Sequence, residues 1–216
     1  MNIYKKIPSI IFVVMLSSFC LYAQDSLTDI GGNVYKTVTI GRQVWMAENL
    51  NVDHYRNGDS IPEVKDSVEW KNLTSGAWCY YNSDPEMTKK YGKLYNWYAV
   101  NDLRGLAPKG WHIPTLDDFR ISATAVNNDG NTLKTIGQGT GDGEGTNSSG
   151  FSALLAGYRN YSRNFRNLGF IAYFRSSTEE NNDNVCIMNL FYNNSNIYWD
   201  LTNDKKNRFS IRCLKN

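Results

Sequence analysis

The sequence is poor in the residues from which catalytic and metal sites are usually built. Its two histidines, His54 and His112, each stand alone in the chain, whereas a zinc site needs several His, Cys or acidic ligands at suitable spacing. We interpret His112, between Trp111 and Ile113, as a structural histidine hydrogen-bonded within the core, with a catalytic base as its alternative role. We interpret His54 as a surface loop residue. The sequence therefore predicts no catalytic residue, no metal ion and no cofactor.

Cysteine is also scarce, since the chain contains only four. Cys20 lies near the N-terminus, and the other three are Cys79, Cys186 and Cys213. This number is far from the dense, even set of a disulfide scaffold, so the fold must depend on its hydrophobic core. One disulfide with one thiol left over and three buried thiols both stay open, and Cys186 and Cys213 could meet across neighbouring strands.

Long hydrophobic runs are missing, apart from a short one near the N-terminus. Two lysines precede the apolar run 10–16, and "SSFCLYAQ" follows it, which is typical of a signal peptide over residues 1–24. The run is shorter than the roughly 18 to 20 residues of a membrane span, so we expect no transmembrane segment. The chain is predicted to be secreted or held at the cell surface after cleavage near Ala23–Gln24. A lipid anchor on Cys20 is the alternative, which the bulky Phe19 disfavours.

An excess of charge is missing too. The chain has 23 basic and 21 acidic residues, and residues 1–24 contain Lys5 and Lys6 but no acid, so cleavage would leave 21 of each sign. A nucleic-acid partner needs a basic surface that this balance does not provide. Residues 25–216 have the length of one domain with a substantial core, and the oligomeric state stays open.

Aromatic residues are plentiful, and the pattern of the chain favours strands and loops. Residues 31–50 alternate β-branched and polar residues around "IGRQ", which predicts a hairpin, and 75–84 and several runs after 151 also resemble strands. The clearest helix start is "IPTLDDF", with Thr115 as N-cap and two acids in the first turn. We expect this helix to end near Asn127, with a second short helix within 87–101 and a long loop over 135–151. The predicted class is α+β, β-rich and loop-rich, with one main helix from Thr115.

Seven segments carry a resemblance to a known family. In order they are "DIGGNVYKTVTIGRQVWMAENL", "GAWCYYN", "YGKLYNWYAVND", "GWHIPTLDDF", "GTNSSGFSALLAGYRN", "AYFRSSTE" and "FSIRCLKN". They resemble the FISUMP domain, the Fibrobacter succinogenes major paralogous domain of secreted bacterial proteins, over about Thr28 to Asn216. The resemblance implies a C-type-lectin-like fold related to the formylglycine-generating, sulfatase-modifying proteins. Ala107 stands where the family usually has a cysteine, so a family disulfide to Cys213 is in doubt, and Phe174 and Arg175 replace an expected tryptophan pair.

The resemblance and the missing reactive residues favour a non-catalytic binding or adhesion module. Its partner would be a polysaccharide or a surface protein. One alternative is an oxidase of the formylglycine-generating type, which would need a metal-binding thiol pair. The other alternative is a structural surface protein without a discrete ligand.

The resemblance to a lectin-like fold places the ligand face on the late strands, over about 156–200, where arginines and aromatics are interleaved. Aromatic faces stack on sugar rings, and the arginine fork binds carboxylates or paired hydroxyls. The candidate ligand residues are Arg159, Tyr173, Arg175 and Trp199. The alternative is that the arginines are solvated and the aromatics belong to the core, which is also how we interpret the aromatic stretch 91–121.

Calcium is a weaker hypothesis. Carboxylate and amide oxygens that could bind it occur in two places, at Asp142 and Glu144 and at Asp200, Asn203 and Asp204. Solvated turn residues explain both groups more simply.

The signal-peptide assignment makes a direct prediction. The exported protein should begin at Gln24 or Asp25, because polar "QDS" follows the apolar run instead of a stop-transfer pattern. N-terminal sequencing of secreted material measures this. An intact Met1, or a lipid on Cys20, would contradict the assignment.

Overall fold

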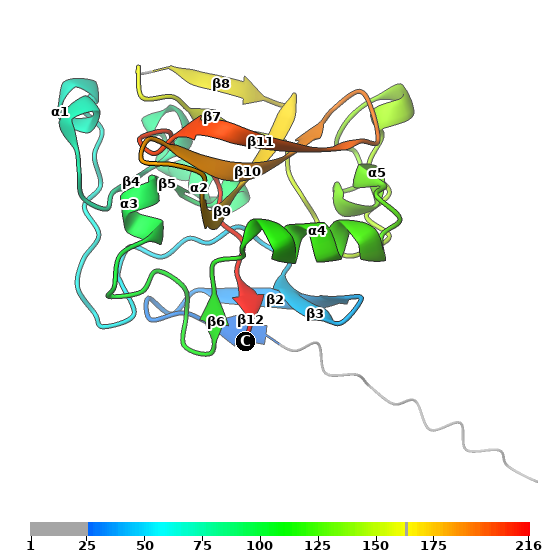
Figure 1. Cartoon of the computed structure of the whole chain (residues 1–216), viewed down its shortest axis with the longest axis horizontal. Coiled ribbons are helices and arrows are strands. Elements are labelled where there is room, and N and C mark those ends of the chain that lie inside the picture. Colours follow the sequence, from blue (N-terminus) through cyan, green and yellow to red (C-terminus); the bar gives the residue numbers. More distant parts are fainter. Residues whose placement is uncertain (1–25, 163) are drawn as a thin grey trace, which may run out of the picture.

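The computed structural model describes residues 26–162 and 164–216, which form a β-rich body with short helices (Figure 1). The proposed signal peptide, its cleavage site and Cys20 lie outside these residues. One antiparallel sheet joins the two ends of the described chain, with the strand order β1-β2-β3-β12-β6. Its strands are β1 (Ser26–Thr28), β2 (Val34–Ile40), β3 (Gln43–Met46), β6 (Trp111–His112) and β12 (Leu214–Lys215). The expected hairpin over 31–50 is confirmed as β2 and β3.

The second large sheet is built by the late strands in the order β11-β10-β9. These are β9 (Ile171–Glu179), β10 (Asn184–Phe191) and β11 (Ile197–Asp204), and all pair antiparallel. Two small two-stranded sheets complete the strands of the described residues: β4 (Trp78–Cys79) with β5 (Leu94–Tyr95), and β7 (Ala156–Arg159) with β8 (Phe165–Leu168). The sequence pattern did not predict β8.

Most helices in the described residues are short. They are α1 (Ser67–Asn72), α2 (Pro85–Tyr91), α3 (Trp97–Val100), α4 (Leu116–Ala125) and α5 (Gly130–Leu133), with single 3-10 turns η1 (Tyr81–Ser83) and η2 (Gly141–Gly143). The pattern predicted α4 and one helix in the region of α2 and α3, but neither α1 nor α5. No helix among these residues is long and apolar enough to cross a membrane.

The helix α4 begins where the sequence predicts, because its first turn is capped in both directions. The Thr115 hydroxyl oxygen accepts a hydrogen bond from the Asp118 amide at 3.1 Å, and the Asp118 carboxylate accepts one from the Thr115 amide at 2.9 Å. This capping box satisfies two N–H groups that have no partner inside the helix. The helix ends at Ala125, two residues before the expected end.

The buried side of α4 joins the two large sheets (Figure 1). Phe119 is fully buried and stacks on Trp45 of β3 with ring centroids 5.2 Å apart. The same hydrophobic cluster includes Phe174 of β9 and Met188 of β10. The helix thus contributes to the apolar contact between the two large sheets, and Phe151 adds to it by packing on both Trp45 and Phe174.

The aromatic stretch 91–121 belongs mainly to the core, as the sequence predicts. Tyr95, Trp97 and Trp111 are buried in a second hydrophobic cluster, and Tyr98 packs against that cluster while partly exposed. Tyr95 also donates a hydrogen bond from its hydroxyl to the Val52 carbonyl at 2.6 Å.

The three cysteines of the described chain are free and buried. Two of them lie in different hydrophobic clusters: Cys213 in the cluster around Tyr95, and Cys79 in the cluster that contains Tyr81. Burial raises the pKa of Cys79, Cys186 and Cys213. The structure therefore favours the buried-thiol alternative over a disulfide.

Residues 207–214 form the central segment of the fold, and every one of them is buried. In Figure 1 this red segment descends from the late strands to β12. Its backbone partners lie in several otherwise separate strands: Tyr95 of β5, Arg159 of β7, Arg175 of β9, Trp45 of β3 and His112 of β6. The elements of the two halves of the chain are therefore assembled around its end.

The contact between α4 and the sheets generates a stability prediction. Phe119→Ala should lower the free energy of unfolding by about 3–5 kcal/mol, because a buried ring leaves a cavity. Ile121→Ala on the same helix is the matched control, since Ile121 is about half exposed and should change stability by no more than about 0.5 kcal/mol. Urea denaturation followed by tryptophan fluorescence measures both, and equal effects would contradict the proposed role of α4.

Candidate functional site

The two arginines of the predicted ligand face lie in the interior. Arg159 and Arg175 are 4% and 0% exposed. The Arg159 Nη2 donates to the Lys65 carbonyl at 3.0 Å, and the Arg175 Nη2 donates to the Asn207 carbonyl at 2.7 Å. Burial lowers the pKa of Arg175 to about 9. As placed, the Arg175 guanidinium binds the central segment, whereas the Arg159 guanidinium binds the backbone just before α1.

The two aromatic residues of that face lie on opposite sides of the β9–β11 sheet. Tyr173 is half-buried, its ring is 5.6 Å from that of Phe209, and its hydroxyl accepts a hydrogen bond from Asn167 at 2.6 Å. Burial raises the pKa of Tyr173 to about 12. Trp199 pairs with Met188 and packs on the core cluster of α4. The structure thus brings Arg159, Tyr173 and Arg175 to the central segment and places Trp199 on the other side of the sheet. A role in ligand binding stays a prediction for all four residues.

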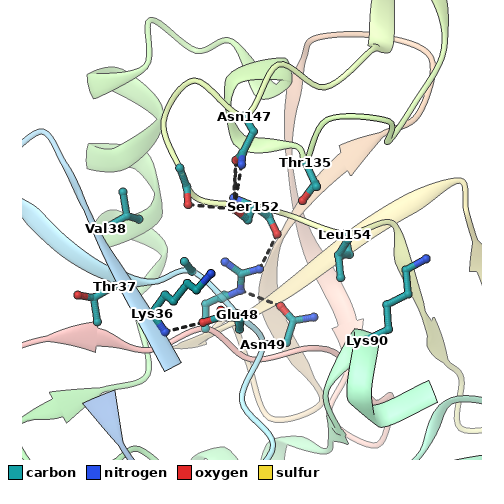
Figure 2. A pocket seen from close by; sticks show the side chains of 13 residues that line it. Lys36, Thr37, Val38, Glu48, Asn49, Lys90, Thr135, Asn147, Ser152 and Leu154 are labelled. Carbon is teal, nitrogen blue, oxygen red and sulfur yellow. Dashed lines mark hydrogen bonds between the residues drawn. The ribbon is translucent and has the colours of Figure 1, made fainter. Parts of the chain in front are cut away.

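A cavity of about 390 Å³ offers a more accessible site (Figure 2). It opens between β2, the segment after β3, α2 and the loop 135–154, with one residue of the central segment in its wall. Its polar and charged lining residues are Lys36, Thr37, Glu48, Asn49, Lys90, Thr135, Asn147, Ser152 and Arg212, and its apolar side chains are Val38, Ala47 and Leu154. We call this cavity the cationic pocket.

Arg212 forms the buried wall of the cationic pocket and is only 1% exposed. Its Nε donates to the Asn49 side chain at 2.7 Å, and Nη2 donates one N–H to the Ser152 carbonyl at 2.9 Å. Nη1 donates to the carbonyls of Met46 and Phe151. Burial lowers the pKa of Arg212 to about 9, so the side chain is still charged at neutral pH. One guanidinium therefore connects three separate segments that line the pocket.

Two residues on the rim have an unusual backbone. Asn147 and Ser152 have φ angles of 52° and 58°, in the left-handed region that non-glycine residues seldom adopt. The Ser152 amide donates to the Asn147 side-chain oxygen at 2.8 Å, and the Asn147 amide group donates to the Ser152 hydroxyl at 3.0 Å (Figure 2). Such conformations persist only where the surroundings enforce them, and they cluster at binding sites. Five other non-glycine residues of the described chain also have a positive φ, so what distinguishes this pair is its place at a cavity.

Positive charge outweighs negative charge around the pocket. Lys36 and Lys90 are exposed and extend from opposite sides of the cavity in Figure 2. Glu48 supplies the one carboxylate of the lining, and it accepts a hydrogen bond from the Lys36 backbone amide at 2.7 Å. With Arg212, three cationic side chains face this single acid.

The loop 135–154 is fixed to the late strands by Lys134, which is completely buried. Its ammonium group donates to the carbonyls of Gly143, Phe191 and Asn194. A Cβ at Gly143 would lie 2.2 Å from the Tyr192 carbonyl oxygen, so glycine permits this close approach. The glycine-rich stretch is therefore a packed loop that holds the rim of the pocket.

Sequence reasoning missed the cationic pocket, although a signal was present. Three of the segments that carry the family resemblance meet there: "AENL" supplies Glu48 and Asn49, "GTNSSGFS" supplies Asn147 and Ser152, and "FSIRC" supplies Arg212. Packing in the hydrophobic core does not explain why these three segments contain polar residues. The pocket could not be located from the sequence, because the segments are about 100 and 60 residues apart and only the fold joins them.

The hypotheses of metal binding gain no support from the structure. The described residues contain no group of three or more His, Cys, Asp or Glu side chains that could hold a metal ion. Asp142 and Glu144 are both exposed. His112 is bonded by its Nδ1 to the Asn216 side-chain oxygen at 2.8 Å, but its side chain is 40% exposed, so the expected position in the core is wrong. His54 is bonded to Asp53 at 2.7 Å.

Comparison with known proteins identifies one family. The family model of the Fibrobacter succinogenes major domain matches residues 38–215, which is most of the chain. No curated protein matches the chain, and neither does any solved structure. The C-type-lectin-like relation is thus not confirmed.

The buried ammonium that fixes the pocket loop generates a pH prediction. Burial lowers the pKa of Lys134 from 10.5 to about 8, so between these values the unfolded chain binds a proton that the folded chain does not. Stability from this group therefore rises as the pH increases from 8 to 10.5. The free energy of unfolding of the wild type minus that of Lys134→Met should increase over this range.

Chemical denaturation at several pH values measures this difference. Other titrating groups are common to both proteins and cancel. A difference that is constant or falls with pH would contradict the effect of burial on Lys134.

Proposed function

The chain belongs to the Fibrobacter succinogenes major domain family, and on this basis we propose that it is an exported, non-catalytic binding module whose ligand occupies the cationic pocket. The observation that carries the proposal is the rim pair Asn147 and Ser152. Both hold a left-handed backbone beside a cavity that is open to a ligand. Keeping two such residues has an energetic cost, which is expected where a binding surface must be held in one shape.

The construction of the pocket supports binding in a fixed conformation. Arg212 connects its walls from inside, and Lys134 anchors the loop that carries its rim. A site that is ordered before the ligand arrives loses less conformational entropy on binding. Its volume lies within the range of about 300–1,000 Å³ that is usual for small-ligand sites.

The chemistry of the lining supports a non-catalytic role. The pocket contains amides, hydroxyls, ammonium groups and one carboxylate, but no histidine or cysteine. A catalytic nucleophile usually needs an adjacent base within hydrogen-bond distance, and no such pair is found among these residues.

The oxidase alternative receives less support from the thiols. The thiolate is the reactive form of cysteine, and all three cysteines of the described chain are buried with raised pKa values. The lectin-like relation stays part of the proposal. It is supported by the sheet that joins the first and last strands and by the single longer helix that packs on both large sheets.

The ligand would be a polysaccharide or a surface protein, and pocket-filling variants test where it binds. Leu154→Trp places a large ring in the half-buried lining and should reduce the affinity of the ligand at least tenfold, which corresponds to about 1.4 kcal/mol. Leu103→Trp is the matched control, because Leu103 is fully exposed and does not line the pocket. Trp199→Ala tests the late-strand site in parallel.

Residues 26–216 would first be screened against an array of glycans and cell-surface proteins. Loss of binding in Leu154→Trp alone supports the pocket, and loss in Trp199→Ala alone moves the site to the late strands. Unchanged affinity in both folded variants contradicts both sites. A screen without any binder contradicts the binding-module proposal itself.

A further inference from the structure

We infer that the cationic pocket recognises an acidic saccharide, with the sugar carboxylate held between Lys36 and Lys90. This inference rests on the proposed function and names the ligand class for the same site. Its starting point is the contrast between the chain and the pocket. Basic and acidic residues are nearly equal over the chain, 23 against 21, whereas the pocket is lined by three cations and one acid.

The buried cation makes this local charge effective. Arg212 forms no ion pair within the described residues, and its four hydrogen bonds reach neutral oxygens. A charge surrounded by protein is screened less than one in water, so its field extends into the adjoining cavity. The aromatic rings of Phe151 and Phe174, 4.6 and 5.4 Å from the guanidinium carbon, exclude water on its inner side. The Glu48 carboxylate already attracts the Arg212 charge, and an anion in the pocket would add the opposite charge that one acid does not supply to three cations.

The exposed cations provide the direct contacts. Lys36 and Lys90 make no ion pair within the described part of the chain. Their ammonium groups can therefore bind a ligand without breaking an ion pair. They extend from opposite sides of the pocket (Figure 2). Glu48 is engaged by the Lys36 amide and lies beside the β2 edge. An acidic group entering between the lysines therefore meets two exposed cations and the field of a third.

The remaining lining fits the polyhydroxylated part of a sugar. Asn49, Asn147 and Ser152 bring side-chain amide and hydroxyl groups to the same lining. Val38 and Leu154 are half-buried apolar residues that can contact the carbon-rich face of a sugar ring. A pocket with cations, hydroxyls, amides and small apolar areas matches a carboxylated sugar better than a simple inorganic anion.

The test uses a trisaccharide of galacturonic acid, its methyl ester and a sulfated neutral trisaccharide of the same length. Calorimetric titration at low salt should show binding of the acid, at least tenfold weaker binding of the ester, and a loss of affinity as salt increases. Equal binding of the sulfated sugar would show that any anionic group is accepted, and this would overturn the carboxylate assignment.

Matched charge variants locate the contact. Lys36→Gln combined with Lys90→Gln should reduce the affinity for the acid at least tenfold. Lys71→Gln combined with Lys109→Gln is the control, since both lysines are exposed, neither lies in the pocket, and the net charge changes equally. Equal losses in the two double variants would overturn the inference, because binding would then follow net charge alone.

The outcomes separate this inference from the proposed function. If a neutral saccharide or a protein binds and Leu154→Trp abolishes that binding, the pocket is the site but the acidic ligand is wrong. If the acid binds equally to wild type and Leu154→Trp, the pocket itself is wrong. If no trisaccharide binds, the inference fails, whatever the array identifies.

Discussion

The fold depends on the burial of one segment, residues 207–214, in its centre. Its backbone pairs with strands that otherwise belong to separate sheets. One segment thereby forms hydrogen bonds with N–H and C=O groups at the edges of these strands, which would otherwise be buried without a partner. The same segment carries Arg208 and Arg212 into the interior. Because a buried guanidinium needs several acceptors in fixed positions, each arginine in turn orders the loops around it. The cationic pocket is one result, since Arg212 holds together segments from three parts of the sequence.

Some of the aromatic residues lie against buried arginines. Arg208 lies over the Trp70 ring, Arg175 over Phe209 and Arg159 over Phe165. Several of their N–H groups have no hydrogen-bond partner among the described residues, so the electron-rich ring faces supply part of the compensation for lost hydration. Burial lowers the pKa of Arg175 and Arg208 to about 9, which shows how strongly their surroundings disfavour charge. The interleaving of arginine and aromatic residues in the late part of the chain is therefore a feature of the interior, and the two arginines of the predicted face belong to it.

Rigidity and accessibility are combined at the pocket. Loops usually carry function because they lie on the surface of a stable scaffold, and the loop 135–154 is such a loop with unusually firm support. Lys134 fixes one side of it, Arg212 fixes the other, and the left-handed pair Asn147 and Ser152 sets the shape between them. The exposed lysines at the rim make no ion pair in the described part of the chain, and Lys90 lies over the Tyr91 ring. The proposed binding of a charged ligand rests on this combination of a supported polar cavity and exposed cations at its mouth.

The sequence by itself determined the elements that depend on neighbouring residues. The capping box at Thr115, the hairpin of β2 and β3, the family and the core character of the stretch around Trp97 all follow from local patterns or from segments in order. Only the tertiary structure decided which residues face a ligand. Strand periodicity tells that Tyr173 and Arg175 share a face, but the central segment, which comes much later in the chain, covers Arg175. The pocket was likewise decided by tertiary contacts, because Glu48, Ser152 and Arg212 come together only when the end of the chain is buried between its earlier parts.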